Sequence, residues 1–327
     1  MPPRNILCIV VARIGDTLLV TPTLRALKQA WPEARLHVVA HPKRMPLLEN
    51  NPDIASLQGF TKKSAPWRGW LRKPMDLALV YGADPALFRY ARRAAKRVIG
   101  FRSGDPALDA LMHDPVSPAP KPMRAVEDRA LLLEPLGVPL PQRRLQYRPH
   151  AEERTWAEHW LRQQVGADAP RIGVQANSFA AKAYRNLPPA MVKTILAGLP
   201  ERYADARILL LGGPNDRADN QAIAALLGSA ALDLGGRFTL RQTAALIAHL
   251  DLYIGVDTGP THLAGCFDIP MLALYHCKHP GRNLMPLDHP RCVGVEHPET
   301  GGPCPESASL ADLPMKRIHA ALAEICA

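Results

Sequence analysis

The chain has few aromatic side chains, few cysteines and no long apolar run. Phe, Trp and Tyr make up 6% of its 327 residues, and its six cysteines show no repeated spacing. This cysteine usage argues against a disulfide framework and is typical of a reducing cytoplasm. No stretch approaches twenty uninterrupted apolar residues, so we expect no membrane span. Residues 1–16 lack a small-residue cleavage site, and we interpret them as a first strand and not as a signal peptide.

Acidic residues are also in the minority. Asp and Glu total 30 against 40 Lys and Arg, which gives a formal net charge of +10. Three kinds of anionic partner suit this charge: nucleic acid, a membrane surface or a phosphorylated substrate. The sequence has no zinc finger, no RNP-like aromatic motif and no basic helix that runs into heptads. We therefore expect no nucleic-acid partner.

What the chain does have is apolar content and a repeating order of elements. Hydrophobic residues make up 47% of the chain, enough for a sizeable core. Segments of helical spacing alternate with short apolar runs that predict strands, at residues 5–11, 34–40, 76–82, 97–101, 171–176, 206–213, 232–236, 252–256 and 271–276. This alternation predicts an α/β fold with two Rossmann-like, doubly wound parallel sheets. We place the two domains at residues 1–150 and 151–327.

A strand that bends into a helix gives the first functional hint. The stretch "LYIGVDTGPTHLAG" (252–265) begins as a buried strand and continues as a helix that Thr258 or Gly259 can cap. Such a turn aims free backbone N–H groups and a positive dipole end outward, which suits a phosphate. Taken alone the signal is weak, because many α/β turns look like this and bind nothing.

The first strand–helix turn, "VVARIGDTLLVTP", lacks the G-x-G-x-x-G of a dinucleotide site. It has a single glycine, Gly15, followed by Asp16 at the start of a helix predicted over residues 16–32. Asp16 fits two roles, an N-cap of this helix or a general base at the carboxyl end of the first strand.

Taken in order, several motifs resemble the heptosyltransferases of glycosyltransferase family 9. They are the first turn, "NNPDI", "RRAAKRVIGF", "LGGPNDR" and "GVDTGPTHLAG". The resemblance implies a GT-B fold, in which two Rossmann-like domains face a central cleft and the C-terminal helix, about 310–326, returns to the first domain. It also implies inverting, metal-independent transfer from a nucleotide-diphospho-heptose, ADP-heptose, to a lipid-linked lipopolysaccharide core acceptor. The enzyme would then be cytoplasmic and peripheral on the inner membrane.

The resemblance also assigns roles to residues. Asp16 matches the base, and Gly15 beside it matches a donor-binding residue. Lys182 would bind the donor and offset the charge of the leaving diphosphate. The matching donor contacts are Asn177 and Ser178 to phosphate, Asp216 to ribose, Phe238 to the nucleotide base through its main chain, Asp257 to sugar hydroxyls, Thr258 and Gly259 to phosphate, and His262. Other roles stay open for three of them: Lys182 as a surface lysine, Asp216 as the N-cap of the following helix, and His262 as a structural histidine.

The chain departs from the family pattern at two places. Tyr184 stands where the family commonly has Trp, and residues 276–304 replace a small Gly-containing turn. The ligand-type side chains of this segment are His276, Cys277, His279, His289, Cys292, His297 and Cys304. They lack the paired spacing of a zinc site, so we expect no metal.

Two alternatives to a heptosyltransferase remain. One is another GT-B enzyme, either a transferase with a different sugar donor or a nucleotide-sugar epimerase. The other is a non-catalytic sugar-nucleotide-binding subunit. If the chain is a transferase, basic side chains of the first domain should hold the anionic acceptor, with Arg68, Arg72, Lys73, Arg92, Arg93 and Lys96 as candidates.

Overall fold

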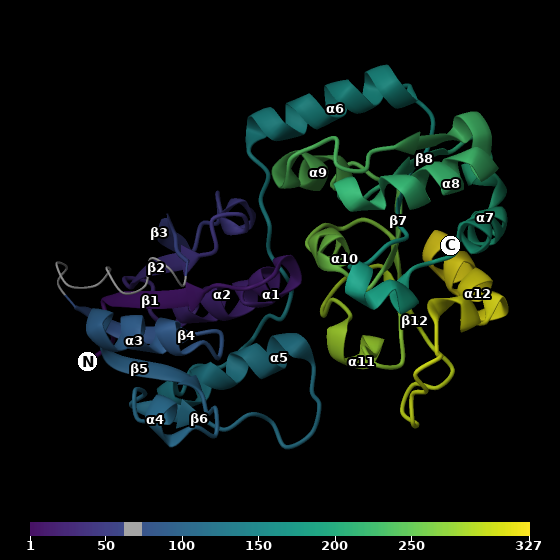
Figure 1. Ribbon diagram of the computed structural model, residues 1–327. Coiled ribbons are helices and arrows are strands. Elements are labelled where there is room, and N and C mark those ends of the chain that lie inside the picture. Colours follow the sequence, from purple (N-terminus) through teal and green to yellow (C-terminus); the bar gives the residue numbers. More distant parts are fainter. Residues whose placement is uncertain (62–73) are drawn as a thin grey trace. The chain divides into compact units, whose positions relative to one another are not determined.

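The computed structural model describes residues 1–61 and 74–327, which form two compact units, 1–148 and 149–327 (Figure 1). Within the described ranges, every helix falls short of the length and apolar character needed to cross a bilayer. Each unit is built on a six-stranded parallel sheet. The two doubly wound sheets predicted from the sequence are therefore confirmed.

The first unit has the strand order β3-β2-β1-β4-β5-β6. Its strands are β1 (Asn5–Val10), β2 (Arg35–Ala40), β3 (Ile54–Gly59), β4 (Met75–Val80), β5 (Ala95–Phe101) and β6 (Asp114–Val116). Its α-helices are α1 (Ile14–Leu19), α2 (Thr21–Ala30), α3 (Pro85–Ala94), α4 (Pro106–Asp109) and α5 (Ala125–Ala130). Two short 3-10 segments, Met45–Leu47 and Leu131–Leu136, complete the described helical elements of this unit.

The second unit has the strand order β12-β11-β10-β7-β8-β9. Its strands are β7 (Arg171–Gln175), β8 (Arg207–Leu210), β9 (Ala231–Asp233), β10 (Leu252–Val256), β11 (Met271–Tyr275) and β12 (Cys292–Glu296). Its α-helices are α6 (Ala151–Val165), α7 (Pro189–Ala197), α8 (Arg217–Leu227), α9 (Leu240–Ile247), α10 (Gly259–Ala264), α11 (Gly281–Leu284) and α12 (Met315–Cys326). Its 3-10 segments are η4 (Ala180–Arg185), η5 (Glu201–Tyr203), η6 (Pro214–Asp216), η7 (Gly228–Ala230) and η8 (Leu310–Asp312).

Both faces of the first sheet are buried, as its near-continuous apolar strands require. Along β1, Ile6, Cys8 and Val10 belong to one core cluster, whereas Leu7 and Ile9 belong to another on the opposite face. Successive side chains of a strand point to opposite faces, so one strand supplies both cores.

Two helices differ from the sequence prediction. The single helix expected over 16–32 is divided into α1 and α2 at Val20, because Pro22 occupies the first turn of a new helix. The C-terminal helix was expected on the first domain. Instead Ile318, Leu322 and Ile325 of α12 lie in the core of the second unit, where α12 contacts β11, β12 and α7.

The chain order reverses direction once in each sheet, between β1 and β4 and between β7 and β10. In open α/β sheets, ligands bind outside the carboxyl ends of the strands at such a switch point. The turns that follow β1, β7 and β10 are therefore the places to look for chemistry.

Candidate active site

Apart from Gly15, the predicted donor-binding residues follow carboxyl ends of strands in the second sheet. Asn177, Ser178 and Lys182 follow β7, Asp216 follows β8, Phe238 follows β9, and residues 257–262 follow β10. Since β7 and β10 are neighbours at the switch point, the fold brings the Lys182 loop and the bend at 257–259 to the same edge.

The bend after β10 contains a buried ion pair that sequence reasoning missed. Arg185 Nη2 donates to Asp257 Oδ2 over 2.7 Å, and the two side chains are only 6% and 10% exposed. His262 Nε2 lies 3.6 Å from the other carboxylate oxygen of Asp257. The Asp257 carboxylate therefore has protein partners on both oxygens. His262 is itself buried, which is the environment expected for a structural histidine, the alternative role that the sequence left open.

Thr258 occupies the N-cap position of α10, but it does not cap the helix with its side chain. Its hydroxyl donates back to the carbonyl of Val256 over 3.2 Å. Gly259 and Pro260 form the first turn that follows. The Thr258 side chain thus leaves the N–H of Gly259 uncapped, and Pro260 has no N–H. This is in keeping with the phosphate contacts predicted for Thr258 and Gly259.

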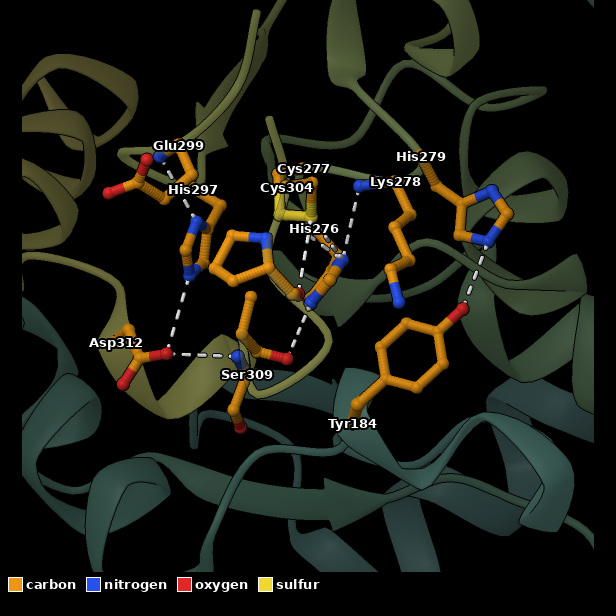
Figure 2. The surroundings of a disulfide bond; sticks show 12 residues. Tyr184, His276, Cys277, Lys278, His279, His297, Glu299, Cys304, Ser309 and Asp312 are labelled. Atoms are coloured by element: carbon orange, nitrogen blue, oxygen red, sulfur yellow. Dashed lines mark hydrogen bonds and ion pairs between the residues drawn. A yellow bond between two sulfur atoms is a disulfide. The ribbon is translucent and has the colours of Figure 1, made fainter. Parts of the chain in front are cut away.

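Lys182 is not a bare surface lysine. It interrupts η4 with φ −133° and ψ 36°, and its Nζ lies 3.2 Å from Nε2 of His279, which follows β11. The hydroxyl of Tyr184 lies 3.2 Å from the same ring nitrogen (Figure 2). His279 therefore joins the candidate site, although the sequence showed it only as one of several histidines in a Pro-rich segment.

Asn177 and Ser178 hold the shape of the Lys182 loop. The Ser178 N–H donates to Asn186 Oδ1 over 2.8 Å, and the Ser178 hydroxyl donates to the Lys182 carbonyl over 3.0 Å. Asn177 is 2% exposed, and its Nδ2 lies 3.5 Å from the amide oxygen of Asn220. These contacts fix the backbone from which Lys182 projects.

Asp216 and Phe238 line the β8 and β9 side of this edge. Asp216 precedes α8 but does not cap it with its side chain. Its carboxylate accepts the Gly213 N–H over 2.7 Å, and burial raises its pKa. The Phe238 ring packs edge-on against Trp156 and Trp160 of α6, at 5.3 and 5.1 Å between ring centroids. Because the Phe238 ring is engaged by these two tryptophans, its main chain is the part left to contact a nucleotide base.

In the first unit, Gly15 and Asp16 lie in the first turn of α1, just beyond the carboxyl end of β1. The N-cap of α1 is Arg13, so the N-cap role considered for Asp16 is wrong. The Asp16 carboxylate instead accepts from Arg129 Nη2 over 3.0 Å. Arg129 is a second residue that the sequence did not reveal, and it also pairs with Asp128 over 2.6 Å.

The described candidates for acceptor binding lie at the edge of the first sheet opposite to Asp16. Lys96 starts β5 and pairs over 3.2 Å with Asp76 at the start of β4, while Arg92 and Arg93 end α3 directly before β5. In a parallel sheet these amino ends lie a strand length, about 20 Å, from the carboxyl ends where Asp16 lies. The other three candidates, Arg68, Arg72 and Lys73, lie outside the described residues.

A disulfide closes the His/Cys-rich segment, although the cysteine usage of the sequence argued against a disulfide framework. Cys277 and Cys304 are bonded across 27 residues, a separation that matches no recognisable motif (Figure 2). His276 donates from Nε2 to the Ala308 carbonyl over 2.8 Å, and its Nδ1 lies 3.7 and 4.0 Å from the two sulfurs. Within residues 1–61 and 74–327, these three form the one His/Cys/Asp/Glu group close enough to share a metal. With its sulfurs bonded to each other, the group offers no thiolate ligand.

Comparison with known proteins identifies the family to which this chain belongs. The model of glycosyltransferase family 9 (heptosyltransferase) matches residues 86–306. The chain belongs to this family. It is thus a glycosyltransferase of the heptosyltransferase type, and the resemblance found in the sequence is confirmed.

Individual relatives agree with this assignment. Lipopolysaccharide heptosyltransferase 3 of Escherichia coli is 25% identical over 284 residues, which cover 80% of each chain. A family 9 glycosyltransferase structure from Veillonella parvula superposes with a TM-score of 0.85 at 19% identity, covering 98% of this chain and 97% of that one. The structure of E. coli ADP-heptose lipopolysaccharide heptosyltransferase II gives a TM-score of 0.78 at 20% identity and covers 98% of both chains. These likenesses confirm the predicted GT-B fold class.

Proposed function

We propose that this chain transfers heptose from ADP-heptose to a lipid-linked, anionic lipopolysaccharide core acceptor at the cytoplasmic face of the inner membrane. The observation that carries the proposal is that Arg185, in the loop of Lys182, bonds to Asp257 in the bend at 257–259, at the switch point of the second sheet. Family membership supports the reaction class. The names of two E. coli relatives support the substrates: heptosyltransferase 3 is named for lipopolysaccharide, and heptosyltransferase II for lipopolysaccharide and ADP-heptose.

Each side chain then has a definite task. The Asp16 carboxylate takes the proton of the acceptor hydroxyl, whose oxygen attacks the anomeric carbon while the bond to the ADP oxygen breaks. The Lys182 ammonium, with backbone N–H groups of Thr258 and Gly259, offsets the negative charge that develops on the departing diphosphate. A single displacement of this kind inverts the anomeric configuration.

We further propose that transfer needs no divalent metal, because Lys182 supplies the positive charge that a metal would otherwise bring to the diphosphate. Activity in excess EDTA should equal activity in buffer with Mg²⁺. A strict requirement for Mg²⁺ or Mn²⁺ would contradict this part of the proposal.

The deciding experiment is a panel of sugar nucleotides titrated calorimetrically, followed by incubation of each binder with a heptose-deficient lipopolysaccharide core. We expect ADP-heptose to bind best and to be consumed only with acceptor, and NMR of the product to show an anomeric configuration opposite to that of the donor. Preference for another sugar nucleotide would point to a different GT-B transferase. Binding without consumption would point to a non-catalytic subunit.

A further inference from the structure

One ring nitrogen of His279 meets both Lys182 and Tyr184. His279 Nε2 lies 3.2 Å from the Lys182 ammonium and 3.2 Å from the Tyr184 hydroxyl. Lys182 and Tyr184 come from η4 after β7, whereas His279 comes from the loop after β11, 97 residues beyond Lys182. The contact therefore ties together two loops that meet at the donor edge of the sheet.

The uncharged state of the ring lets Nε2 accept one hydrogen bond, which the Lys182 ammonium can donate. Burial, followed by the positive charges of Arg185 and Lys182, lowers the pKa of His279 to about 4, with Asp257 acting in the opposite direction and His276 adding to the lowering. At neutral pH the imidazole is therefore uncharged and can present an Nε2 lone pair. A lysine ammonium has only donors, so its contact with a neutral ring nitrogen is a charge-assisted hydrogen bond.

The loop that carries His279 is fixed at several points. The His279 N–H donates to the His276 carbonyl over 2.8 Å, and the Cys277–Cys304 disulfide anchors the residue two positions earlier. The Tyr184 ring lies against the His276 ring at 4.6 Å between centroids, and the Lys278 ammonium lies 5.4 Å from the centre of the Tyr184 ring (Figure 2). His279 is thus a rigid acceptor, and Tyr184 supplies a hydroxyl that the Trp common in the family cannot.

We propose that His279 is a positioning residue that holds the Lys182 ammonium in place for the donor diphosphate. The inference rests on the proposed function, in which Lys182 binds that diphosphate. A free lysine side chain loses rotamer freedom when it engages a ligand, and a side chain held beforehand loses less. Removal of the acceptor should therefore weaken donor binding by about tenfold, the factor that corresponds to roughly 1.4 kcal/mol.

The first test is calorimetric titration with ADP, the fragment that carries the diphosphate, at pH 7.5. We expect His279→Leu to raise the Kd for ADP about tenfold, and His279→Gln, which keeps an acceptor, to recover most of the loss. The matched control is His319→Leu. His319 is also partly buried and hydrogen-bonded through Nε2, to the Thr194 carbonyl at 3.0 Å, but lies on α12. The control should keep the wild-type Kd, and an equal loss in the control would overturn the inference.

A double-variant cycle separates positioning from a general structural effect. In a Lys182→Met background, His279→Leu should cause no further loss, because there is no ammonium left to position. A full tenfold loss in that background would overturn the inference. If Lys182→Met itself binds ADP as tightly as the wild type, the result contradicts the proposed role of Lys182 in binding the diphosphate. If Lys182→Met is weak and His279→Leu is normal, only the positioning role fails.

A measurement on unaltered His279 covers the case in which His279→Leu does not fold. In lysine-selective NMR of the wild type, the resonance that disappears in Lys182→Met should exchange with water more slowly than those of exposed lysines. Exchange at the rate of exposed lysines would overturn the inference.

Discussion

Arg185 and Asp257 are 72 residues apart in the sequence, yet the Arg185 guanidinium donates to the Asp257 carboxylate across the switch point of the second sheet. The pair joins the loop that carries Lys182 to the bend that begins α10. It therefore fixes the relative position of the two segments proposed to bind the diphosphate.

Loss of Arg185 should destabilise the protein strongly. Arg185→Leu leaves the Asp257 charge buried and without its main partner, which costs about 3–5 kcal/mol of unfolding free energy. Urea unfolding at pH 7 measures this loss. The double variant Arg185→Leu/Asp257→Leu should recover part of it, because no uncompensated charge remains.

An exposed pair provides the control for Arg185→Leu. Arg162 and Glu158 lie one turn apart on α6, with side chains 64% and 55% exposed. Arg162→Leu should therefore change the unfolding free energy by less than about 1 kcal/mol. Equal losses from Arg162→Leu and Arg185→Leu would show that burial of the Arg185–Asp257 pair has no special effect.

The general-base role of Asp16 predicts a loss of rate without a loss of donor binding. Asp16→Ala should lower kcat roughly 10²–10⁴-fold, because proton transfer from the acceptor is removed, and should leave the Kd for ADP within about twofold of the wild type. Asp128→Ala is the control, since Asp128 is the other carboxylate on Arg129. A wild-type kcat for Asp16→Ala, or an equal loss for Asp128→Ala, would leave Asp16 only an ion-pair role.

The strands that sequence reasoning missed have a common position. β3, β6 and β12 are edge strands of their sheets, and most of their residues are only partly buried. An edge strand carries a weaker apolar signal than a central strand such as β10, which is buried along its whole length and was predicted. β9 is also an edge strand, but it was predicted, because the glycines at 235 and 236 mark its end in the sequence.

The residues of the candidate site also fall into two groups, those that the sequence reveals and those that only the fold brings together. Motifs that can be recognised in the sequence alone contain Lys182, Asp257 and Thr258. Arg129, Arg185 and His279 acquire their partners over 113, 72 and 97 residues, through loops whose meeting depends on strand order. Local pattern carries no information about such contacts, so these residues emerge only from the fold.

The disulfide should stabilise the second unit and tighten donor binding. Closing a loop across 27 residues restricts the unfolded chain by about 3–4 kcal/mol. Reduction of the wild type, or Cys277→Ser, should therefore lower the unfolding free energy by that order. It should also raise the Kd for ADP, because the His279 loop loses an anchor.

Cys292 provides the control for the disulfide, since it is a free cysteine in the same segment. Cys292→Ser should match the wild type in stability and should respond to reductant as the wild type does. If the reduced and oxidised wild type unfold at the same urea concentration and bind ADP equally well, the disulfide has neither effect.

The net positive charge leads to a prediction about salt. An anionic acceptor bound near Asp16 would lie over basic side chains that follow carboxyl ends of the first sheet. Exposed examples are Arg13 after β1, Lys43 after β2 and Arg102 after β5. Because exposed charges are screened over about 8 Å at physiological ionic strength, the acceptor KM should rise with added salt more steeply than the donor KM.

Charge-neutralising variants locate the basic side chains responsible. Replacement of Arg13, Lys43 and Arg102 by Gln should raise the acceptor KM at low salt and flatten its salt dependence. The same replacement of Arg92, Arg93 and Lys96 removes an equal charge at the amino edge, so it should leave the slope unchanged. Equal flattening by both sets would mean that the acceptor responds only to net charge. If the acceptor and donor KM rise in parallel with salt, the basic residues of the first unit have no acceptor role.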